Sequence, residues 1–330
     1  MRVMVTGANG FLGFEAVRRL LARGDGVIAM DTAIGPHLHA LAGADERLHV
    51  MSADLTDLAN VAHVFKVLRP DAVLHFAAVV GVLASLGSPS NILRVNVQGS
   101  LNLFEAMRLF GVRRVIHLSS EEVYGDFVAT PASEDHPQVP LMPYGVTKLA
   151  VEHFGRTYRE LHGIECINVR ASWVYGVRLD RPRPPMNYLN AALRGEAVNA
   201  PRGAETTIDY TYVDDVIDGV LLALDHMQHR FDVYNIASGT ATSDHDLATL
   251  IEELVPGATV RIGPGRREFA PGIRIPIKGA LDCSRARAEL GYQPKFDIRR
   301  GLETYVAEWR KLHGNGSARI PEPVRQRLSP

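Results

Sequence analysis

Residues Val3–Gly13 read Val-Met-Val-Thr-Gly-Ala-Asn-Gly-Phe-Leu-Gly, and they decide the fold. A short apolar strand ends at Thr6, and glycines follow at Gly7, Gly10 and Gly13 as an amphipathic helix begins. Gly7 allows a tight turn, Gly10 lets the backbone approach a ligand, and Gly13 lets the helix pack closely on the strand. Because the N–H groups at the start of that helix are unpaired, they attract an anion. The stretch therefore predicts a site for the diphosphate of a dinucleotide.

The residue that ends the next strand indicates which dinucleotide is bound. After the helix Phe11–Arg23, Gly26–Met30 reads as a second strand, and Asp31 stands at its end, 18 residues after Gly13. A carboxylate there accepts hydrogen bonds from ribose hydroxyls and repels a 2′-phosphate. We therefore expect NAD rather than NADP. The plain alternative is an ordinary strand–helix–strand unit with an exposed aspartate.

The composition is that of an ordinary globular protein. The chain has 330 residues, 46% of them hydrophobic and 22% charged, enough for one large or two closely joined domains. A formal net charge of −1 gives no overall field that would attract nucleic acid or an anionic membrane surface. The longest apolar run, Ala72–Gly87, is shorter than the ~20 residues that span a bilayer, and the first strand begins at once. We expect no membrane segment and no signal peptide.

Cysteines and histidines predict neither a disulfide framework nor a metal site. The two cysteines, Cys166 and Cys283, are too few for either, and their scarcity favours a reducing, cytoplasmic setting. The 13 histidines are scattered, and pairs such as His226 and His229 read as polar surface residues rather than ligands.

Apolar strands and amphipathic helices alternate through the first half of the chain. This order is typical of a parallel sheet covered on both faces, so we expect an α/β fold with a doubly wound parallel sheet over residues 1–170 and a return segment near 209–237. The irregular texture of residues 171–312 predicts a smaller α/β lobe that binds the substrate, and 313–330 reads as a disordered tail. Beyond the first two strands, we expect strands at 49–52, 71–76, 114–119, 164–169, 206–210, 232–236 and 259–262, and helices at 58–68, 92–110, 144–161, 186–194, 213–226, 244–254, 284–290 and 298–312.

Ligands of such sheets lie at the carboxyl ends of the strands, and the residues found there suit a dinucleotide. Asp54 and Leu55 follow the third strand, where Asp54 would hold the adenine edge or simply start a turn. Ala77 and Ala78 follow the fourth strand and are small enough for a cofactor to lie against the backbone. Asn96 is a polar residue in an apolar helix, and we expect a hydrogen bond near the cofactor rather than a satisfied core amide.

Tyr144 and Lys148 carry the predicted chemistry. Four residues apart on a helix that Pro143 begins, they share one face. A phenol has a pKa of about 10, and a Lys ammonium together with the positive charge of an oxidised nicotinamide would favour the phenolate. Tyr144 would then accept a proton from a substrate hydroxyl while a hydride leaves the same carbon, with Ser120 bonded to that hydroxyl. The plain alternative is a surface pair at i and i+4.

Several motifs together resemble one enzyme family. They are Thr6-Gly-Ala-Asn-Gly-Phe-Leu-Gly13, Asp31, His75-Phe-Ala-Ala78, Ser119-Ser-Glu-Glu-Val-Tyr-Gly125, Tyr144-x-x-x-Lys148 and Tyr212-Val-Asp-Asp215. The combination resembles the extended short-chain dehydrogenase/reductases, and within them the NAD-dependent sugar epimerase/dehydratase family, from Met1 to about Leu312.

The resemblance implies a Rossmann domain that holds NAD tightly, with Ser120, Tyr144 and Lys148 as catalytic residues. It also implies a homodimer in which the long helices 92–110 and 144–161 of two subunits form a four-helix bundle. With the observations above, the expected NAD-binding residues are Gly7, Asn9, Gly10, Phe11, Leu12, Gly13, Asp31, Asp54, Leu55, Phe76, Ala77, Ala78, Asn96, Ser119, Tyr144 and Lys148.

Two positions depart from the family pattern at the substrate. Trp173 stands where nucleotide-sugar members usually carry an Asn, and Ile208 where they carry an Arg; both usual groups contact the nucleotide diphosphate. Losing one charge-assisted contact costs roughly 1.5–3 kcal/mol, about ten- to a hundredfold in affinity. Either nearby arginines compensate, or the site takes a smaller substrate such as a sugar acid held by an arginine fork, or these arginines line a solvated loop. The arginines are Arg178, Arg181, Arg183 and Arg274.

Glu121 and Glu122 favour a dehydratase. In family dehydratases that act at C4 and C6 of a sugar nucleotide, an acidic pair follows the catalytic hydroxyl residue and eliminates water. One carboxylate near C5 would act as base and a protonated partner as acid. Glu122 also resembles the Glu of sugar-nucleotide decarboxylases. The alternative is that both acids are structural or solvated.

The combined prediction is an NAD-dependent epimerase/dehydratase that oxidises a secondary hydroxyl of a sugar or nucleotide-sugar-like substrate, with Tyr144 as base. In that family the hydride usually returns after the keto intermediate has rearranged. The enzymatic alternative is a dehydrogenase of a sugar or sugar acid that releases NADH. A non-catalytic NAD-binding regulatory protein would be expected to lack Tyr144 or Lys148, and both are present.

Overall fold

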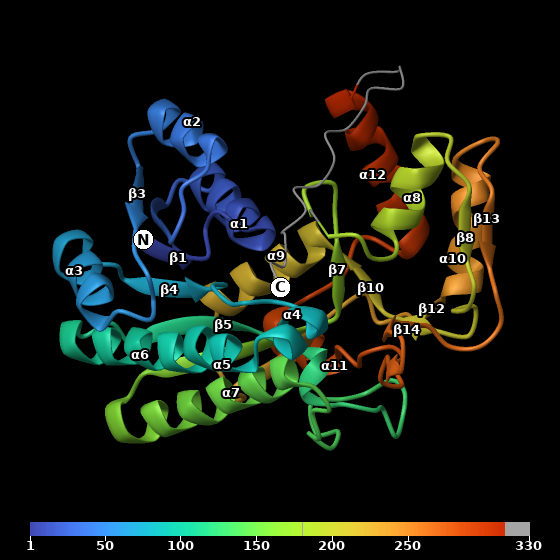
Figure 1. Cartoon of the computed structure of the whole chain (residues 1–330). Helices are drawn as coiled ribbons and strands as arrows, with labels where there is room; N and C mark the ends of the chain where they lie inside the picture. The colour runs from blue at the N-terminus through green and yellow to red at the C-terminus, as the bar shows by residue number, and fades with distance from the viewer. Residues whose placement is uncertain (180, 314–330) are drawn as a thin grey trace.

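A seven-stranded parallel sheet forms the centre of the computed structural model, which describes residues 1–179 and 181–313 (Figure 1). The strand order is β11-β6-β5-β4-β1-β2-β3. The sheet confirms the predicted doubly wound α/β fold, whereas the predicted tail beyond residue 313 lies outside the described residues. The strands are β1 (Arg2–Thr6), β2 (Gly26–Asp31), β3 (Leu48–Ser52), β4 (Ala72–His75), β5 (Arg114–Ser120), β6 (Glu165–Ala171) and β11 (Val233–Ile236).

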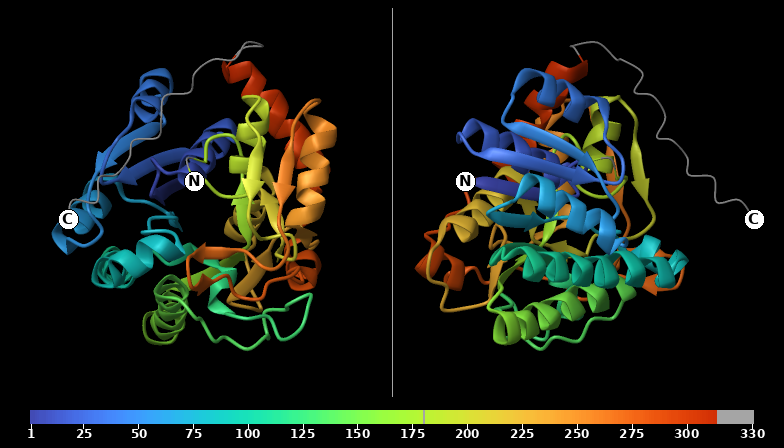
Figure 2. Two further views of the ribbon diagram at one scale, coloured as in Figure 1. Left: turned by 45° about the vertical axis from the view of Figure 1, so that its right-hand side comes forward. Right: turned by 90° about the vertical axis from the view of Figure 1, so that its left-hand side faces the viewer.

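Helices cover both faces of this sheet, and each face has its own core (Figure 2). On one face lie α1 (Phe11–Ala22) and α9 (Val213–Asp225), whose buried side chains join the larger core. On the other face α3 (Leu58–Leu68), α6 (Gly99–Phe110) and α7 (Pro143–His162) surround the smaller one. The central strands are therefore covered on both faces and are mostly apolar, as the hydrophobic strand sequences predict, although some buried positions such as His117 and Arg170 are polar.

A smaller lobe follows the sixth strand and lies on one side of the sheet (Figure 1). It consists of three helices and short two-stranded sheets. Its elements are β7 (Trp173–Tyr175) with β10 (Tyr210–Tyr212), β8 (Val198–Ala200) with β13 (Val260–Ile262), β9 (Thr207–Ile208) with β12 (Thr242–Ser243), β14 (Glu268–Ala270) with β15 (Ile273–Arg274), and α8 (Met186–Leu193), α10 (Asp244–Leu254) and α12 (Ile298–His313). Helix α11 (Ser284–Leu290) packs against α9 and β11.

Several elements differ from the predicted ones. The expected helix 92–110 is α5 (Pro89–Ile92), a π-helical segment over Leu93–Gln98, and α6. The expected strand 206–210 is split at Asp209 into β9 and β10, because the two parts pair with different strands, β12 and β7. The buried Asp209 carboxylate accepts hydrogen bonds from the backbone N–H groups of Ser238, Gly239 and Leu281. The sequence reading also missed α2 (Pro36–Ala44) and α4 (Val82–Gly87). No described helix is both long and apolar enough to cross a membrane.

A buried ion pair joins the long helix α7 to the sheet. Glu152 on α7 accepts hydrogen bonds from Arg170 on β6, at 2.9 and 2.6 Å, and both side chains are fully buried. The Ser119 hydroxyl at the end of β5 donates to the same carboxylate at 2.6 Å. Because α7 also carries Tyr144 and Lys148, the pair holds the predicted catalytic face of that helix against the strand ends.

We expect Glu152→Gln to lower the free energy of unfolding by about 3–5 kcal/mol, because it leaves the Arg170 guanidinium buried without its counter-charge. Urea denaturation followed by circular dichroism measures this. Glu160→Gln, at an exposed position of the same helix, is the matched control and should stay within about 0.5 kcal/mol of the parent. Equal stabilities for the two variants would show that the pair contributes nothing.

Candidate active site

The loop between β1 and α1 forms a backbone cradle at the carboxyl edge of the sheet. Gly7 has φ +68°, and a Cβ there would lie 2.7 Å from the backbone N of Ala77. A Cβ at Gly13 would lie 2.1 Å from the carbonyl oxygen of Gly7, so neither position admits a side chain. A Cβ at Gly10 would meet only that same oxygen, at 3.2 Å, so the surface of Gly10 is open. Helix α1 starts immediately after Gly10, at Phe11 and Leu12, and its first N–H groups face this opening. The cradle fits a diphosphate.

Asp31 lies beside this cradle at the end of β2. Its carboxylate accepts hydrogen bonds from the backbone N–H groups of Asn9, at 2.9 Å, and Thr32, at 2.7 Å. The Asn9 side chain in turn accepts from the N–H of Gly35, at 2.8 Å. These contacts, with two longer ones from the Thr32 hydroxyl at 3.4 Å and the Ala33 N–H at 3.5 Å, orient the carboxylate. Its remaining lone pairs could accept from ribose hydroxyls, as NAD binding requires.

The residues predicted to bind the rest of the cofactor take different positions. Leu55 and Phe76 are buried, and Ala77 and Ala78 follow β4 directly beside Gly7. Asp54 is exposed, and its carboxylate accepts from the N–H of Thr56 at 2.8 Å, so it starts a turn as the alternative had it.

Two residues that the sequence predicts to contact the cofactor form hydrogen bonds within the protein instead. The Asn96 amide accepts from the N–H of Val79 at 2.7 Å and donates to Val79 O and Thr147 Oγ1, both at 3.1 Å. It therefore braces the loop after β4 against α7. Ser119 donates to Glu152, so its hydroxyl belongs to the ion-pair network rather than to the open edge.

The structure brings Ser120, Tyr144 and Lys148 together at the edge next to the cradle. Ser120 ends β5, and Tyr144 lies in the first turn of α7. The Lys148 ammonium lies 5.9 Å from the centre of the Tyr144 ring and donates to the carbonyl oxygen of Leu118 at 2.7 Å. All three side chains are largely buried, which excludes the alternative of a surface pair.

Electrostatics of the protein alone hold Tyr144 protonated. Burial raises the pKa of Tyr144 to about 12, opposed by the guanidinium groups of Arg181 and Arg183 and a hydrogen bond to Ser120. Burial therefore outweighs the neighbouring positive charges in the protein alone. Burial lowers the pKa of Lys148 to about 8 against the attraction of Glu152, and the ammonium stays charged at neutral pH. The positive charge of an oxidised nicotinamide would add to that of the arginines in favouring the phenolate.

Glu121 and Glu122 are buried beside this group and share one cation. The wholly buried Lys278 ammonium lies 3.5 Å from a Glu122 oxygen and 3.9 Å from a Glu121 oxygen, and it donates to the Glu121 backbone carbonyl at 3.4 Å. The Ser172 hydroxyl donates to the Glu121 carboxylate at 2.9 Å. Burial raises the pKa of Glu121 to about 7, against the attraction of Lys278. Both carboxylates are therefore buried next to the Lys278 ammonium, and neither is solvated.

Arg181 and Arg183 lie at the substrate side of Tyr144 without a carboxylate partner among the described residues. Burial lowers the pKa of Arg183 to about 10, and that of Arg181 is also lowered by burial. Arg183 donates to the carbonyl oxygen of Val174 at 2.8 Å, while its buried Nε has no hydrogen-bond partner. Its guanidinium lies 5.0 Å from the centre of the Trp173 ring. Two partly buried cations beside one phenol are a suitable site for an anion.

The other two predicted arginines lie elsewhere. Arg178 is exposed and covers the ring of Phe14 on α1 at 5.1 Å. Arg274 is 58% exposed and forms a bidentate pair with Asp126, at 2.7 Å for both contacts. Neither joins the pair beside Tyr144.

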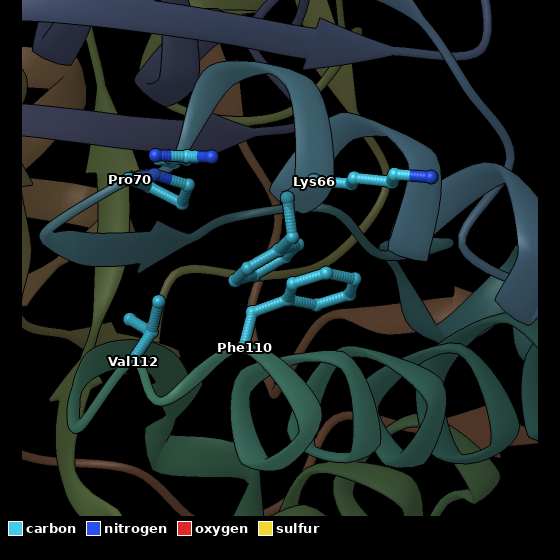
Figure 3. A pocket seen from close by; sticks show the side chains of 6 residues that line it. Lys66, Pro70, Phe110 and Val112 are labelled. Atoms are coloured by element: carbon cyan, nitrogen blue, oxygen red, sulfur yellow. The ribbon is translucent and has the colours of Figure 1, made fainter.

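A surface hollow of about 220 Å³ lies at the other end of the sheet (Figure 3). It is lined by Phe65, Lys66, Arg69, Pro70, Phe110 and Val112, between the ends of α3 and α6. These segments lead into the amino ends of β4 and β5, so the hollow is separate from the edge that carries Ser120.

Sequence reasoning missed three residues of the site. Lys278 stands in the apolar stretch Ile275–Leu281, and a lone Lys in such surroundings was the signal available. Ser172 follows β6 directly, and this strand-end position was the available signal. Arg267 covers the ring of Trp173 at 5.1 Å and pairs with Asp244 at 3.0 Å, and nothing local indicates it.

Comparison with known proteins agrees with this geometry. Residues 3–237 match the model of the NAD dependent epimerase/dehydratase family. A UDP-glucose 4-epimerase of Mycolicibacterium smegmatis is 35% identical over 319 residues, which cover 94% of this chain and 99% of the relative.

Two solved structures show the same likeness in three dimensions. A UDP-glucose 4-epimerase of Thermotoga maritima has a TM-score of 0.83 at 29% identity, over 94% of this chain and 99% of that one. A dTDP-glucose 4,6-dehydratase of Streptomyces venezuelae, crystallised with NAD, has a TM-score of 0.83 at 28% identity, over 95% and 98%. With its cradle and its tyrosine–lysine pair, the chain belongs to the NAD-dependent epimerase/dehydratase family and uses NAD as its cofactor.

Proposed function

We propose that this enzyme epimerises a secondary carbinol carbon of a nucleotide-linked sugar acid, with Tyr144 as the base and the carboxylate bound by Arg183, beside Arg181. The observation that carries the substrate is the partly buried arginine pair beside Tyr144, which has no carboxylate partner among the described residues. Relatives support the class: a UDP-glucuronate 4-epimerase of Arabidopsis thaliana is 29% identical over 345 residues. A UDP-glucuronic acid 4-epimerase of Bacillus cereus, solved with UDP-glucuronic acid and NAD, has a TM-score of 0.79 at 27% identity.

The protein's own groups handle the proton of the reaction. When bound, NAD would supply the acceptor and donor of the hydride at the carbinol carbon. Tyr144 receives the hydroxyl proton as phenolate, and Ser120 hydrogen-bonds the same oxygen. Lys148, anchored to Leu118 O, keeps its ammonium next to the cofactor edge, where it can bond ribose hydroxyls. In the reverse proton transfer, the Tyr144 phenol would return its proton to the same oxygen.

The contacts of Glu121 and Glu122 favour epimerisation over the elimination of water. An elimination base has to be free to take a proton from C5 of the sugar. Glu122 is paired with Lys278, and Glu121 is bonded by Ser172. Glu121, with a pKa of about 7, is present in both protonation states at neutral pH. Dehydration is therefore the competing outcome, and analysis of the products distinguishes it from epimerisation.

One observation favours a second candidate substrate, the free sugar acid. Ile208, which stands where nucleotide-sugar members carry an Arg, is fully buried and offers no polar group to a diphosphate. Trp173, at the other departing position, has the guanidinium groups of Arg183 and Arg267 at 5.0 and 5.1 Å from its ring. A free acid oxidised with release of NADH would need neither diphosphate contact.

We further propose a homodimer through α6 and α7. Large apolar side chains of these helices are exposed in the single chain, among them Leu109 at 57% and Leu161 at 70%. Burying them between two copies would remove apolar surface from water. The cytoplasmic location stays a prediction, and both cysteines are free and buried.

Tyr144→Phe should reduce turnover by about 10²–10⁴-fold, because it removes the group that accepts the proton, while NAD stays bound. Turnover is followed with UDP-glucuronic acid and UDP-glucose, and NAD is quantified by absorbance after release from the purified protein. Tyr158→Phe is the matched control on the same helix, since the Tyr158 hydroxyl bonds Glu105 away from the site. Near-normal turnover of Tyr144→Phe would remove this residue from the mechanism.

Arg183→Gln should reduce kcat/KM for UDP-glucuronic acid by about 10- to 100-fold and leave that for UDP-glucose nearly unchanged, because only the former carries the carboxylate. Arg178→Gln is the control, because this exposed arginine lies on Phe14. Equal losses for both sugars would contradict the carboxylate assignment. Oxidation of free glucuronic acid with one NADH released per turnover would establish the second candidate instead.

Glu122→Gln tests the elimination route. If the enzyme is an epimerase, the variant should still give the C4 epimer, and parent and variant should release neither water nor CO₂ from the sugar, as judged by NMR and mass spectrometry of the products. Loss of a dehydrated or decarboxylated product while the substrate still reduces bound NAD would assign Glu122 as the base. Glu105→Gln, on the outer helix α6, serves as the control.

A further inference from the structure

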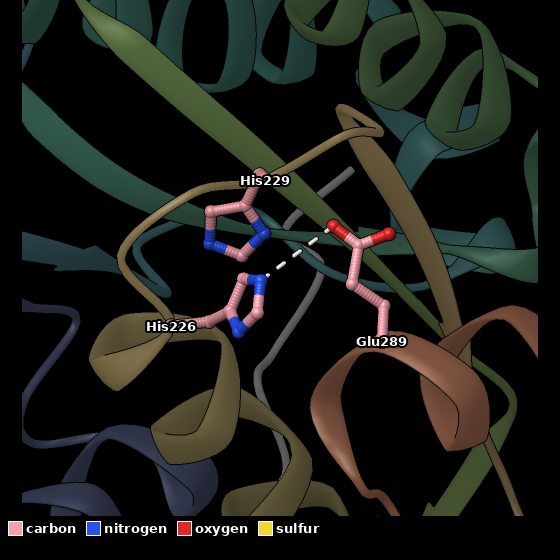
Figure 4. A group of neighbouring side chains, drawn as sticks. All are labelled: His226, His229 and Glu289. Carbon is pink, nitrogen blue, oxygen red and sulfur yellow. Dashed lines mark ion pairs between the residues drawn. The ribbon is translucent and has the colours of Figure 1, made fainter.

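Three potential ligands of a metal ion meet at the amino end of the edge strand β11 (Figure 4). His226 follows the end of α9, His229 lies in the loop that leads to β11, and Glu289 is on α11. One atom of each lies within 4.8 Å of the others, and Figure 4 shows the two rings and the carboxylate facing one another. His229 is only 7% exposed, so the sequence reading of it as a surface residue is wrong.

The hydrogen bonds around this cluster leave acceptor lone pairs that have no hydrogen-bond donor. His229 Nε2 lies 2.9 Å from the carbonyl oxygen of Ala223 and must carry a proton to bond it, so Nδ1 of the neutral ring presents a lone pair. The Tyr234 hydroxyl has one proton but lies 2.9 Å from that Nδ1 and 2.8 Å from Glu289 Oε1. Glu289 Oε2 is buried and has no hydrogen-bond partner among the described residues. The cluster thus offers more acceptors than donors.

We propose that His226, His229 and Glu289 bind a divalent transition-metal ion of the zinc class. Two imidazoles and a carboxylate are a ligand set that zinc accepts, with its fourth position left to water. The His229 Nε2–H bond to a backbone carbonyl is the support that metal-bound histidines usually have. His226 would bind through Nε2 as the Nδ1–H tautomer and give up its contact with the Gln228 carbonyl at 3.1 Å.

The cluster has to contract by about 1 Å for this, because zinc bonds of about 2.0–2.2 Å place ligand atoms about 3.4 Å apart. His226 is the residue that can move: its side chain is 31% exposed and it stands just past the helix end. The competing cation is Arg230, whose Nε lies 3.4 Å from Glu289 Oε2. Its side chain is 73% exposed and can turn into solvent, while its backbone N–H keeps its bond to Oε1 at 2.6 Å.

The location assigns the ion a structural role. β11 pairs with β6 from Val233↔Asn168 to Ile236↔Ala171, and Ala171 is also the partner of Ser120 in β5. The catalytic residues therefore lie at the carboxyl ends of these strands, and the cluster precedes the amino end of β11. A bound ion would connect the end of α9, the lead into the edge strand and α11, without touching the reaction.

The test uses the full chain with NAD bound, free of any histidine tag and stripped with a chelator. Zinc is titrated by calorimetry and thermal shift, and Co²⁺ is used as a spectroscopic probe, because its visible absorption reports imidazole coordination. We expect one ion per chain and a higher melting temperature with zinc. His226→Ala and Glu289→Gln should each weaken binding at least about tenfold, whereas Arg230→Gln should strengthen it. His39→Ala, at an exposed position of α2, should leave it unchanged.

Zinc binding that is unaffected by both His226→Ala and Glu289→Gln would overturn the proposal, and so would the absence of binding to the parent. His226→Ala protects the test against misfolding, because this half-exposed ring supports little packing. Catalytic turnover is not part of the readout, so the outcome is independent of the proposed substrate.

Discussion

The buried pair between Glu152 and Arg170 is the constraint on which the site depends. It fixes α7 to β6, and Ser119 adds the end of β5 to the same carboxylate. Lys148, one turn before Glu152, donates to Leu118 of β5 and fixes the helix a second time. Two anchors four residues apart share one helix face, so α7 can neither slide nor rotate against the sheet. Tyr144 lies one turn before Lys148, and the two anchors place it at the edge where the cofactor cradle opens.

Features that follow from local sequence could be predicted. The glycine spacing around Gly10 and the acid at Asp31 determine backbone shape and charge within a few residues, and the cradle has the expected form. The bounds of α3 agree exactly, because the Asp57 side chain caps its start by accepting from the N–H groups of Ala59 and Asn60. The spacing of Tyr144 and Lys148 placed both on one face, and the family could be recognised from such motifs. The residue roles and the domain bounds remain predictions.

Features that depend on tertiary contacts could not be predicted. Lys278 comes from the far end of the chain, and only folding brings it between Glu121 and Glu122. The reversed sign of the Tyr144 pKa shift has the same origin, because spacing reveals a neighbouring ammonium but not the burial that outweighs it. Asn96 shows the limit in another way. The sequence shows its polarity in an apolar helix but not its hydrogen-bond partners, Val79 and Thr147, which lie in other segments. Through these hydrogen bonds Asn96 connects the loop after β4 to α7.

The charges around Tyr144 restrict how an anionic substrate can bind. The phenolate and the carboxylate of the proposed substrate would both need positive charge, and Arg181 and Arg183 lie near both. If both arginines turned to the carboxylate, the phenol would lose two cations that lower its pKa. The conflict is resolved if each arginine has one role. Arg181 has the larger effect on the pKa of Tyr144, whereas Arg183 has an Nε without a hydrogen-bond partner and lies over the Trp173 ring. Arg183 is therefore the better carboxylate ligand, and Arg181 together with the oxidised nicotinamide remains to favour the phenolate.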